Sequence, residues 1–558
     1  MSSYYDDASL MLLASGGAQK DGKVYSVKPT DGSGDFTFTR GSNLSATRVN
    51  ASQLIEKGRE NLFLQSNQFD TTWAENYLSR TSGQSGYDGT NDAWKLQGFS
   101  GTAEKRIRQN TTATGIVTLS VYAKAGNIDF LWLRGVTSST NVRTFFDLTN
   151  GTIGTNAAVS SKITSVGNGW YRCEATFNQQ AGFEHYIGIS DADGSAVSST
   201  TGYLYIQDAQ LEQGLVATPY IETGASTAQA GILENTPRFD YSGGATCPSL
   251  LLEPSRTNQC SQSEYIGSID WNQGGITRSL VITQTSETNP EGASICWKIQ
   301  GTASDNQLAN NSSTNSGTTI TNSVYVKRVS GTSNVLLRNV NNNDTSFSLS
   351  VADGWKRIDV TATATSATAR FYLNLLDFND EILVWGAQQE IGNYPTSYIP
   401  TYGVNQTRAT ESYANNSATN LIGQTEGVLF IDFVPNTDTL STKWLTFLGG
   451  GSNYIGIYIP SSSNNIRLEV ADTTNQATFN VPYVAGQRYK CAIAYANNDV
   501  TAYANGVQLG SDTNASIPAT STIRSYYNLS NIESTDTNQL LLFKTRLTNA
   551  ELAALTTI

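Results

Sequence analysis

The sequence predicts an all-β protein built from three tandem antiparallel β-sandwiches, of which the first two are related jelly rolls, with an extended N-terminal arm. Three observations support this fold class. Apolar and polar residues alternate in short runs along the chain, which is the pattern of half-buried strands. Turns rich in Gly, Asn and Ser separate these runs. Six sequence landmarks recur in the same order, so two stretches of the chain are copies of one module.

The composition agrees with this fold class and argues against others. Of the 558 residues, 38% are hydrophobic and only 15% are charged, and Ser, Thr and Asn fill much of the remainder. A helical bundle would need an excess of Leu, Glu, Lys and Ala. A disordered chain would carry more charge and would lack the 10% of aromatic residues that are present.

The charge and the apolar runs exclude several partners. The formal net charge is −12, so the chain lacks the basic surface that nucleic acid requires. No apolar run approaches the roughly 20 residues that span a bilayer, and we expect no membrane insertion. The run Leu10–Ala14 is too short, and the residues before it are too acidic, for a secretory signal. Five scattered cysteines do not form a disulfide framework, so we expect synthesis and folding in a cytosol.

The patterns divide the chain into six parts. These are an N-terminal arm at 1–59, module 1 at 60–222, a linker and second arm at 223–256, module 2 at 257–403, a linker at 404–424, and a third sandwich at 425–558.

Modules 1 and 2 match at the six landmarks. In chain order these are Asn61 and Trp73 with Asn258 and Trp271, 93–96 with 296–299, 120–124 with 323–327, 169–172 with 354–357, 207–212 with 385–390, and 219–221 with 397–399. Within the modules, Leu119, Val121 and Ala123 share one face of a strand, and the polar residues between them share the other. Seven or eight such runs in each copy predict a two-sheet jelly roll.

Each copy is preceded by a leader, at 35–61 and at 236–258. These leaders hold too few apolar residues to fold as domains on their own. We expect them to be extended arms, laid on the sandwiches or on a neighbouring subunit.

The third sandwich shows its own strands and turns. Apolar residues alternate in 454–460, 466–470 and 489–495. Asn505-Gly506 between two alternating runs is a strong hairpin signal. The segment 547–555 predicts a short terminal helix, with Thr548 or Asn549 as its cap.

Several of these motifs resemble known families. The segments 488–495, 500–507 and 542–552 resemble the concanavalin A-like lectin/laminin G domain. The repeated module, with its opening at 61–73, its centre at 120–126 and its close at 396–408, resembles the carbohydrate-binding-module-like jelly rolls of bacteriophage virion proteins. The N-terminal segment 25–40 is also similar to these phage proteins. The resemblances imply a virion-surface protein, a fibre or a decoration, with sugar-binding or adhesive sandwiches, and they leave head or tail open.

Candidate carbohydrate-binding residues come from outward aromatic side chains, because sugars bind to flat rings and to polar side chains beside them. In the third sandwich these are Trp444, Tyr454 and Tyr458, whose alternative role is to line a second buried face. In the modules they are the recurring Tyr122 and Tyr325. Tryptophans that recur in both copies are expected to serve the framework instead.

We expect neither catalysis nor a bound metal. The single histidine, His185, lies in an alternating run and is expected to be a strand residue. The third sandwich lacks the Glu-x-Asp-x-x-Glu run of glucanases that share the concanavalin-like fold. Asp191 and Asp193, like Asp377 and Asp380, are expected to form turns or at most a structural calcium loop.

Three functions remain open: a phage virion structural protein with glycan-binding modules, a secreted adhesin or lectin, and a polysaccharide depolymerase. For the first, we expect assembly in the host bacterial cytoplasm, attachment to capsid or tail proteins through residues 1–59, an outward third sandwich that binds host surface glycans, and a homo-oligomer. Fibres of this resemblance are usually trimers.

Overall fold

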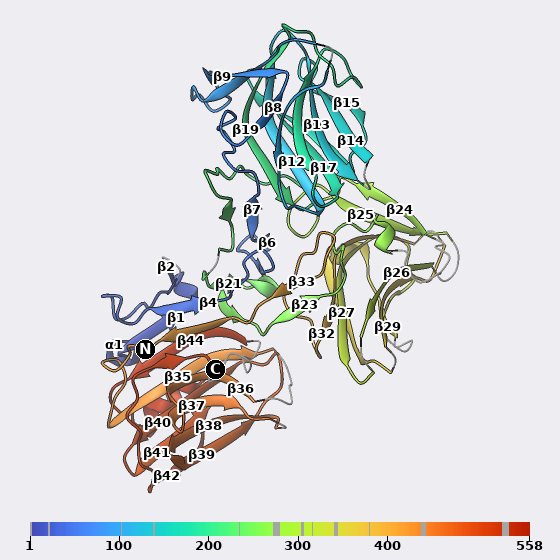
Figure 1. Cartoon of the computed structure of the whole chain (residues 1–558). Coiled ribbons are helices and arrows are strands. Elements are labelled where there is room, and N and C mark those ends of the chain that lie inside the picture. The colour runs from blue at the N-terminus through green and yellow to red at the C-terminus, as the bar shows by residue number, and fades with distance from the viewer. Residues whose placement is uncertain are drawn as a thin grey trace.

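The computed structural model describes the chain except residues 1–2, 21–22, 102, 138–139, 234, 272–279, 303–305, 315, 340–343, 366, 379, 437–441, 462 and 527–534. The chain forms three lobes of antiparallel strands that meet at a common junction (Figure 1). The all-β fold class is therefore confirmed. Among the described helices, none is long and apolar enough to cross a bilayer.

Module 1 is a sandwich of two sheets. One sheet has the order β16 (Ser160–Gly167), β17 (Trp170–Gln179), β12 (Gly115–Ala125), β19 (Tyr203–Gln213), β10 (Ala93–Gly98), β9 (Leu78–Gln84). The other has the order β15 (Thr152–Asn156), β14 (Thr140–Asp147), β13 (Phe130–Thr137), β18 (Glu184–Ser190), β11 (Lys105–Asn110), β8 (Ala74–Asn76). Leu119, Val121 and Ala123 of β12 are fully buried between the sheets, as their alternation predicts.

Module 2 repeats this arrangement. Its first sheet has the order β24 (Leu280–Thr285), β25 (Cys296–Gly301), β32 (Glu381–Ile391), β27 (Thr319–Ser330), β30 (Lys356–Thr363). Its second has the order β26 (Asn306–Ser313), β31 (Thr368–Leu375), β28 (Val335–Arg338), β29 (Asp344–Phe347). Strands β25, β32 and β27 of module 2 therefore occupy the places of β10, β19 and β12 of module 1.

Equivalent side chains make the same hydrogen bonds in the two modules. The Asn61 amide donates to the carbonyls of Ala209 and Ile221, and its oxygen accepts from two backbone N–H groups. Asn258 makes the corresponding bonds to Ala387 and Ile399. Because a buried amide left without partners costs free energy, this asparagine holds the chain entry, strand and exit of each module in one arrangement.

The third sandwich contains two large sheets. The first has the order β21 (Arg238–Asp240), β22 (Ser249–Leu252), β44 (Thr535–Phe543), β35 (Glu426–Pro435), β40 (Tyr489–Ala496), β41 (Asp499–Ala504), β42 (Val507–Asp512), with β1 (Leu10–Leu13) also on β44. The second has the order β2 (Gln19–Lys20), β3 (Lys23–Val24), β4 (Phe36–Thr39), β34 (Ser412–Asn415), β43 (Ile523–Arg524), β36 (Lys443–Gly450), β37 (Asn453–Ile459), β38 (Asn465–Asp472), β39 (Thr474–Pro482).

Short elements complete the chain. The arms and linkers form three small ladders: β5 (Thr47–Val49) with β6 (Ile55–Lys57), β7 (Arg59–Asn61) with β20 (Ala228–Ala230), and β23 (Arg256–Asn258) with β33 (Gln406–Arg408). The α-helices are α1 (Ser3–Asp7) and α2 (Asn549–Thr556), and 3-10 turns lie at Ala14–Gly16, Ser242–Gly244, Ile269–Trp271 and Val351–Asp353.

Two local predictions are confirmed in the third sandwich. Asn505 and Gly506 connect β41 to β42 and both have positive φ, as a two-residue hairpin turn requires. Thr548 caps α2: its hydroxyl accepts from the Glu551 N–H, and the Glu551 carboxylate accepts from the Thr548 N–H.

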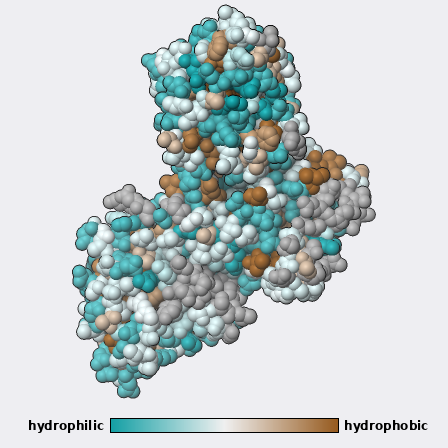
Figure 2. All heavy atoms as spheres, viewed as in Figure 1, coloured by the Kyte–Doolittle hydropathy of each residue, from teal (hydrophilic) through white to brown (hydrophobic). Residues whose placement is uncertain are grey.

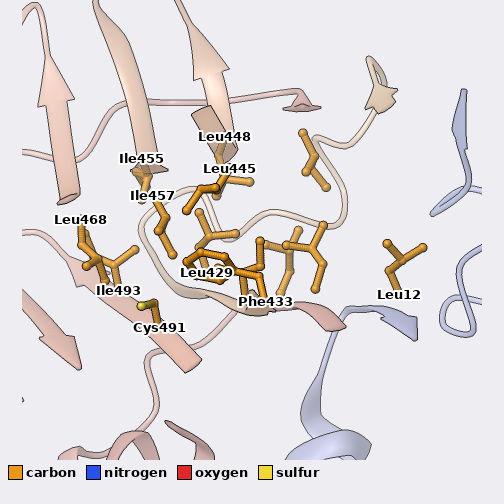
Figure 3. Close-up of a cluster of buried hydrophobic side chains, with 14 of the residues drawn as sticks. Leu12, Leu429, Phe433, Leu445, Leu448, Ile455, Ile457, Leu468, Cys491 and Ile493 are labelled. Atoms are coloured by element: carbon orange, nitrogen blue, oxygen red, sulfur yellow. The ribbon is translucent and has the colours of Figure 1, made fainter. Parts of the chain in front are cut away.

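The N-terminal arm, expected to lie on the sandwiches or on a neighbouring subunit, contributes strands to the third sandwich. Its strand β1 pairs with β44, and β4 pairs with β34. Leu10, Leu12, Phe36 and Phe38 are buried in the core of the third sandwich. Leu12 lies in the same buried cluster as Leu429 (Figure 3). The arm is part of the sandwich because its apolar faces complete the core.

The second arm joins the same sandwich. β22 pairs with β44 beyond the end of β1, and Leu250 and Leu252 enter the same core. The linker strand β34 lies between β4 and β43. The third sandwich thus extends beyond the predicted range 425–558, because three earlier segments supply strands to it.

A buried ionic cluster ties these three segments together. Arg40 from the N-terminal arm and Arg238 from the second arm both bind Glu411 of the linker, with Arg40 Nε 2.8 Å from Glu411 Oε1. Glu253 binds both Arg238, at 2.7 Å, and Arg408, at 2.9 Å. All five side chains are at most 3% exposed. The neighbouring guanidinium groups of Arg408 and Arg238 hold the pKa of Glu253 at about 2 in spite of its burial, so its charge is retained.

Modules 1 and 2 also contact one another directly. Ile116 and Leu215 of module 1 pack against Ile295 of module 2. The Ile116 N–H donates to the Tyr402 carbonyl at 2.7 Å, and Gly115 lies so close to Tyr402 that a side chain there would clash with that backbone. The first two lobes therefore share a packed interface.

Removing residues 1–39 tests the role of the N-terminal strands. Each large buried apolar side chain contributes about 1.5–3 kcal/mol, so the loss of several is comparable to the whole stability of a domain, about 5–15 kcal/mol. We expect the deletion to abolish the unfolding transition of the third sandwich in calorimetry and to leave modules 1 and 2 folded. Phe38→Ala should lower the same transition, whereas Thr37→Ala, which changes an exposed neighbour on β4, should not. A deletion variant with every transition intact contradicts this role.

Glu411→Gln tests the ionic cluster. The substitution leaves Arg40 and Arg238 buried with too little negative charge, and removing one partner of a buried pair costs about 3–5 kcal/mol. The surface pair Arg48–Glu56 is the matched control, because Glu56→Gln should cost less than about 1 kcal/mol. Chemical denaturation measures the loss of unfolding free energy in both variants. Equal losses would show that the buried cluster contributes no more to stability than the surface pair.

Candidate functional site

The aromatic residues predicted in the third sandwich lie together on the outer side of β36 and β37. The rings of Trp444 and Tyr458 are stacked with centroids 4.3 Å apart, and Tyr454 meets Trp444 edge-on at 5.3 Å. The Tyr454 and Tyr458 hydroxyls donate to the two carboxylate oxygens of Glu469, at 2.5 and 2.7 Å. Burial and the Glu469 carboxylate raise the pKa of Tyr458 to about 12.

This cluster is largely closed. Trp444 is 7% exposed and Tyr458 is 6% exposed, and only Tyr454 is partly accessible. Such burial matches the alternative role, in which the rings line a second packed face. Alanine substitutions here would remove core contacts, so they would not separate binding from folding.

The other predicted pair, Tyr122 and Tyr325, occupies equivalent positions in different surroundings. Tyr325 of module 2 packs in a cluster with Trp385 and with Ile55 from the N-terminal arm. Tyr122 of module 1 stacks instead on Tyr87, with centroids 3.8 Å apart and planes 6° from parallel. The outer face of the module 2 sheet is thus covered by the arm at this point, whereas module 1 uses a loop of its own.

The Tyr87 loop is held by two residues that sequence reasoning missed. Its backbone N–H donates to Gln207 Oε1 at 3.1 Å, and its hydroxyl donates to Asp208 Oδ2 at 2.9 Å. Asp208 has a φ of 53°, in the left-handed region, and its equivalent in module 2 is Gly386 with a φ of 64°. An aspartate at a position where the repeat has glycine is the sequence signal that marks this difference.

The exposed part of the module 1 sheet continues past Tyr122 as a row of side chains. Across the strands, Lys95 of β10 faces Tyr205 of β19, which in turn faces Lys124 of β12. Tyr203 lies beside this row, with its ring centroid 5.7 Å from that of Tyr205 and 4.1 Å from Lys95 Nζ. All four side chains are partly exposed. We call Lys95, Lys124, Tyr203 and Tyr205 the lysine–tyrosine face.

Figure 2 shows that the lobe of module 1 is predominantly hydrophilic on the side in view, with hydrophobic residues gathered toward its base. A hollow lies between modules 1 and 2, with a volume of about 760 Å³. Ser, Thr and Gln side chains, with Lys162 and Glu174, line much of it, and no described residue of its lining is aromatic. The lysine–tyrosine face is the better candidate for a sugar because it offers accessible rings.

The described residues do not assemble a metal centre. They contain no group of three or more His, Cys, Asp or Glu side chains placed to hold an ion. Asp193 accepts from the backbone and hydroxyl of Thr155, and Asp191 accepts from Ser199. Asp380 pairs with Arg328 at 3.1 Å. These carboxylates thus tie loops together. His185 is fully buried on β18, and its burial lowers its pKa to about 3.

Comparison with known proteins gives structural similarities only. No family model and no curated protein sequence matches the chain. A Ruminococcus gnavus IT-sialidase CBM40 bound to α2,3-sialyllactose is 13% identical over 25% of this chain and 87% of its own, with a TM-score of 0.23. The tandem CBM22 domains of Paenibacillus barcinonensis Xyn10C are 10% identical over 63% of this chain and 100% of their own, with a TM-score of 0.21. A Trypanosoma rangeli sialidase is 10% identical over 86% and 97%, with a TM-score of 0.23.

Asp208→Asn tests the environment of the Tyr87 loop. Burial, with smaller contributions from Asp92 and Asp88, raises the pKa of Asp208 to about 6. The pKa of an aspartate in the unfolded chain is about 3.9. The folded state therefore binds more protons than the unfolded state between these values, and this group makes module 1 more stable as the pH falls from 6 to 4.

Asparagine tolerates positive φ and does not titrate. We expect Asp208→Asn to stabilise module 1 at pH 8 by about 2–3 kcal/mol and to flatten the dependence of stability on pH between 4 and 6. Denaturant melts at a series of pH values measure both effects. Asp70→Asn, at an exposed site of the same module, serves as the control. An unchanged pH profile contradicts the assignment.

Proposed function

We propose that this chain is a non-catalytic, glycan-binding structural protein of a bacteriophage particle, a fibre or a decoration, and that module 1 binds the sugar. The observation that carries the binding role is the lysine–tyrosine face. Tyr203 and Tyr205 present accessible rings, and Gln97, which faces Tyr203 across the strands, adds an amide. Rings flanked by polar groups suit the flat apolar faces and the hydroxyl groups of sugars.

The comparison between the two modules supports assigning this role to module 1. At the positions of Tyr203 and Tyr205, module 2 has Glu381 and Leu383, and Leu383 is 1% exposed. The arm covers Tyr325, so module 2 retains little of the aromatic surface. The two copies share a framework, but only module 1 keeps an accessible pair of rings at these equivalent positions.

The placement on a phage particle is supported by the resemblance of the repeated module and of 25–40 to virion proteins. The attachment surface proposed from the sequence needs revision, because strands β1 to β4 belong to the third sandwich. An attachment role for the N-terminus would therefore involve the lobe that contains it. Mass spectrometry of purified particles should find the chain, and particles that lack it contradict this placement.

The double substitution Tyr203→Ala/Tyr205→Ala tests the binding role in the intact chain. Removing two sugar-stacking rings should weaken binding on a glycan array by at least about tenfold, since each ring contact is worth about 1 kcal/mol or more. Phe378→Ala is the control, because it removes an exposed ring from module 2. Equal binding by the double variant and the parent would remove this face from the proposal. An unmodified chain that binds no glycan would contradict the binding role itself.

A further inference from the structure

We propose that module 1 selects glycans that carry carboxylate groups, and that Lys95 and Lys124 are the residues that recognise them. This inference rests on the proposed glycan-binding function and deepens it. It is carried by a difference between the two copies of the module in how the same pair of lysines is neutralised.

In module 1 the two lysines flank one ring. Lys95 and Lys124 face Tyr205 from opposite sides, on strands β10 and β12, which flank β19. Neighbouring strands lie about 4.8 Å apart, so the lysine backbones are separated by roughly 10 Å with the ring between them. Within the described part of the chain, neither ammonium group forms an ion pair with a carboxylate. Lys95 instead lies over the face of Tyr203, at 4.1 Å.

Module 2 has the same two lysines in the same register. Lys298 and Lys327 both face Leu383, which occupies the place of Tyr205. Here each ammonium group has a carboxylate from its own module: Lys298 Nζ is 2.8 Å from Glu381 Oε1, and Lys327 Nζ is 3.4 Å from Glu287 Oε2. Module 2 thus shows that each lysine of this pair can donate to a carboxylate in this geometry.

A substitution between the copies explains the difference at Lys95. Glu381 of module 2 corresponds to Tyr203 of module 1, so module 1 has exchanged the internal carboxylate for a ring. Lys124 also forms no ion pair within the described part of the chain, so two positive charges lie on one sheet face of a chain whose net charge is −12. A carboxylate on a bound sugar would take the place of the internal partner, while Tyr203 and Tyr205 contact the sugar ring. Because the lysines are partly exposed, this attraction will weaken with salt.

The experiment measures binding of the full-length chain to an array of matched glycan pairs. Each pair consists of a carboxylated glycan, such as a sialylated or uronic acid oligosaccharide, and its neutral counterpart, either desialylated or carboxyl-reduced. Sulfated glycans form a third arm. We expect preferential binding to the carboxylated members, with affinity that falls as ionic strength rises.

Three variants identify the residues. Lys95→Gln/Lys124→Gln should lower affinity for carboxylated glycans by about tenfold and lower affinity for neutral glycans much less. Tyr203→Glu should weaken binding to both members of a pair, because it removes a stacking ring. It should also reduce the preference for the carboxylated member, because it gives Lys95 the internal carboxylate that Lys298 has. The matched control is Lys298→Gln/Lys327→Gln in module 2, where the lysines already have partners and binding should not change.

The outcomes separate this inference from the function on which it rests. Equal binding to carboxylated and neutral members overturns the inference and leaves glycan binding standing. A preference for sulfated over carboxylated glycans overturns the assignment of the carboxylate. A carboxylate preference that survives the double lysine substitution overturns the assignment of the residues. Failure to bind any glycan overturns the proposed function and this inference together.

Discussion

The buried cluster of Arg40, Arg238, Arg408, Glu253 and Glu411 is the constraint on which the arrangement of the lobes depends. Charges without contact to water must be paired, and here the pairs join the N-terminal arm, the second arm and the last linker. The three segments must therefore be in place at the same time. The N-terminal arm that supplies Arg40 continues into β5 and β6, and Ile55 of β6 covers Tyr325. The junction that fixes the lobes also closes one face of module 2, while the lysine–tyrosine face of module 1 lies outside it.

Much of the fold follows from local pattern. Strand alternation, the Asn505-Gly506 turn and the Thr548 cap each depend on neighbouring residues, so the sequence predicts them directly. The strand with which an apolar strand pairs is not determined by the residues adjacent to it in the sequence. The run Leu10–Ala14 is too short for a signal segment, and nothing near it in the sequence indicates β44, which lies more than 500 residues away. The sequence therefore predicts arms, and only the three-dimensional pairing shows that they are strands of the third sandwich.

The candidate site is a similar case. Outward aromatic residues are predictable from alternation, and Tyr122 and Tyr325 follow from the repeat. Whether a ring is accessible depends on what covers it: Glu469 and neighbouring rings close the Trp444 cluster, and the arm closes Tyr325. The lysine–tyrosine face leaves a fainter signal. It appears when the copies are compared position by position, because the lysines recur while Glu381 is replaced by Tyr203.

Strand β1 is synthesised long before its partner β44, and this order has a consequence for folding during biosynthesis. Tyr5, in α1 just before β1, and Gln539 of β44 are 534 residues apart. At a translation rate of about 5–20 residues per second, roughly 30–100 s pass between the emergence of β1 and that of its partner. Modules 1 and 2 can fold on the ribosome during this time. Until the third sandwich is synthesised, the core that buries Leu10, Leu12, Phe36 and Phe38 is incomplete. These apolar strands are then open to nascent-chain chaperones and to pairing with a neighbouring chain on the same polysome, so the rate of elongation becomes a determinant of the yield of correctly closed molecules.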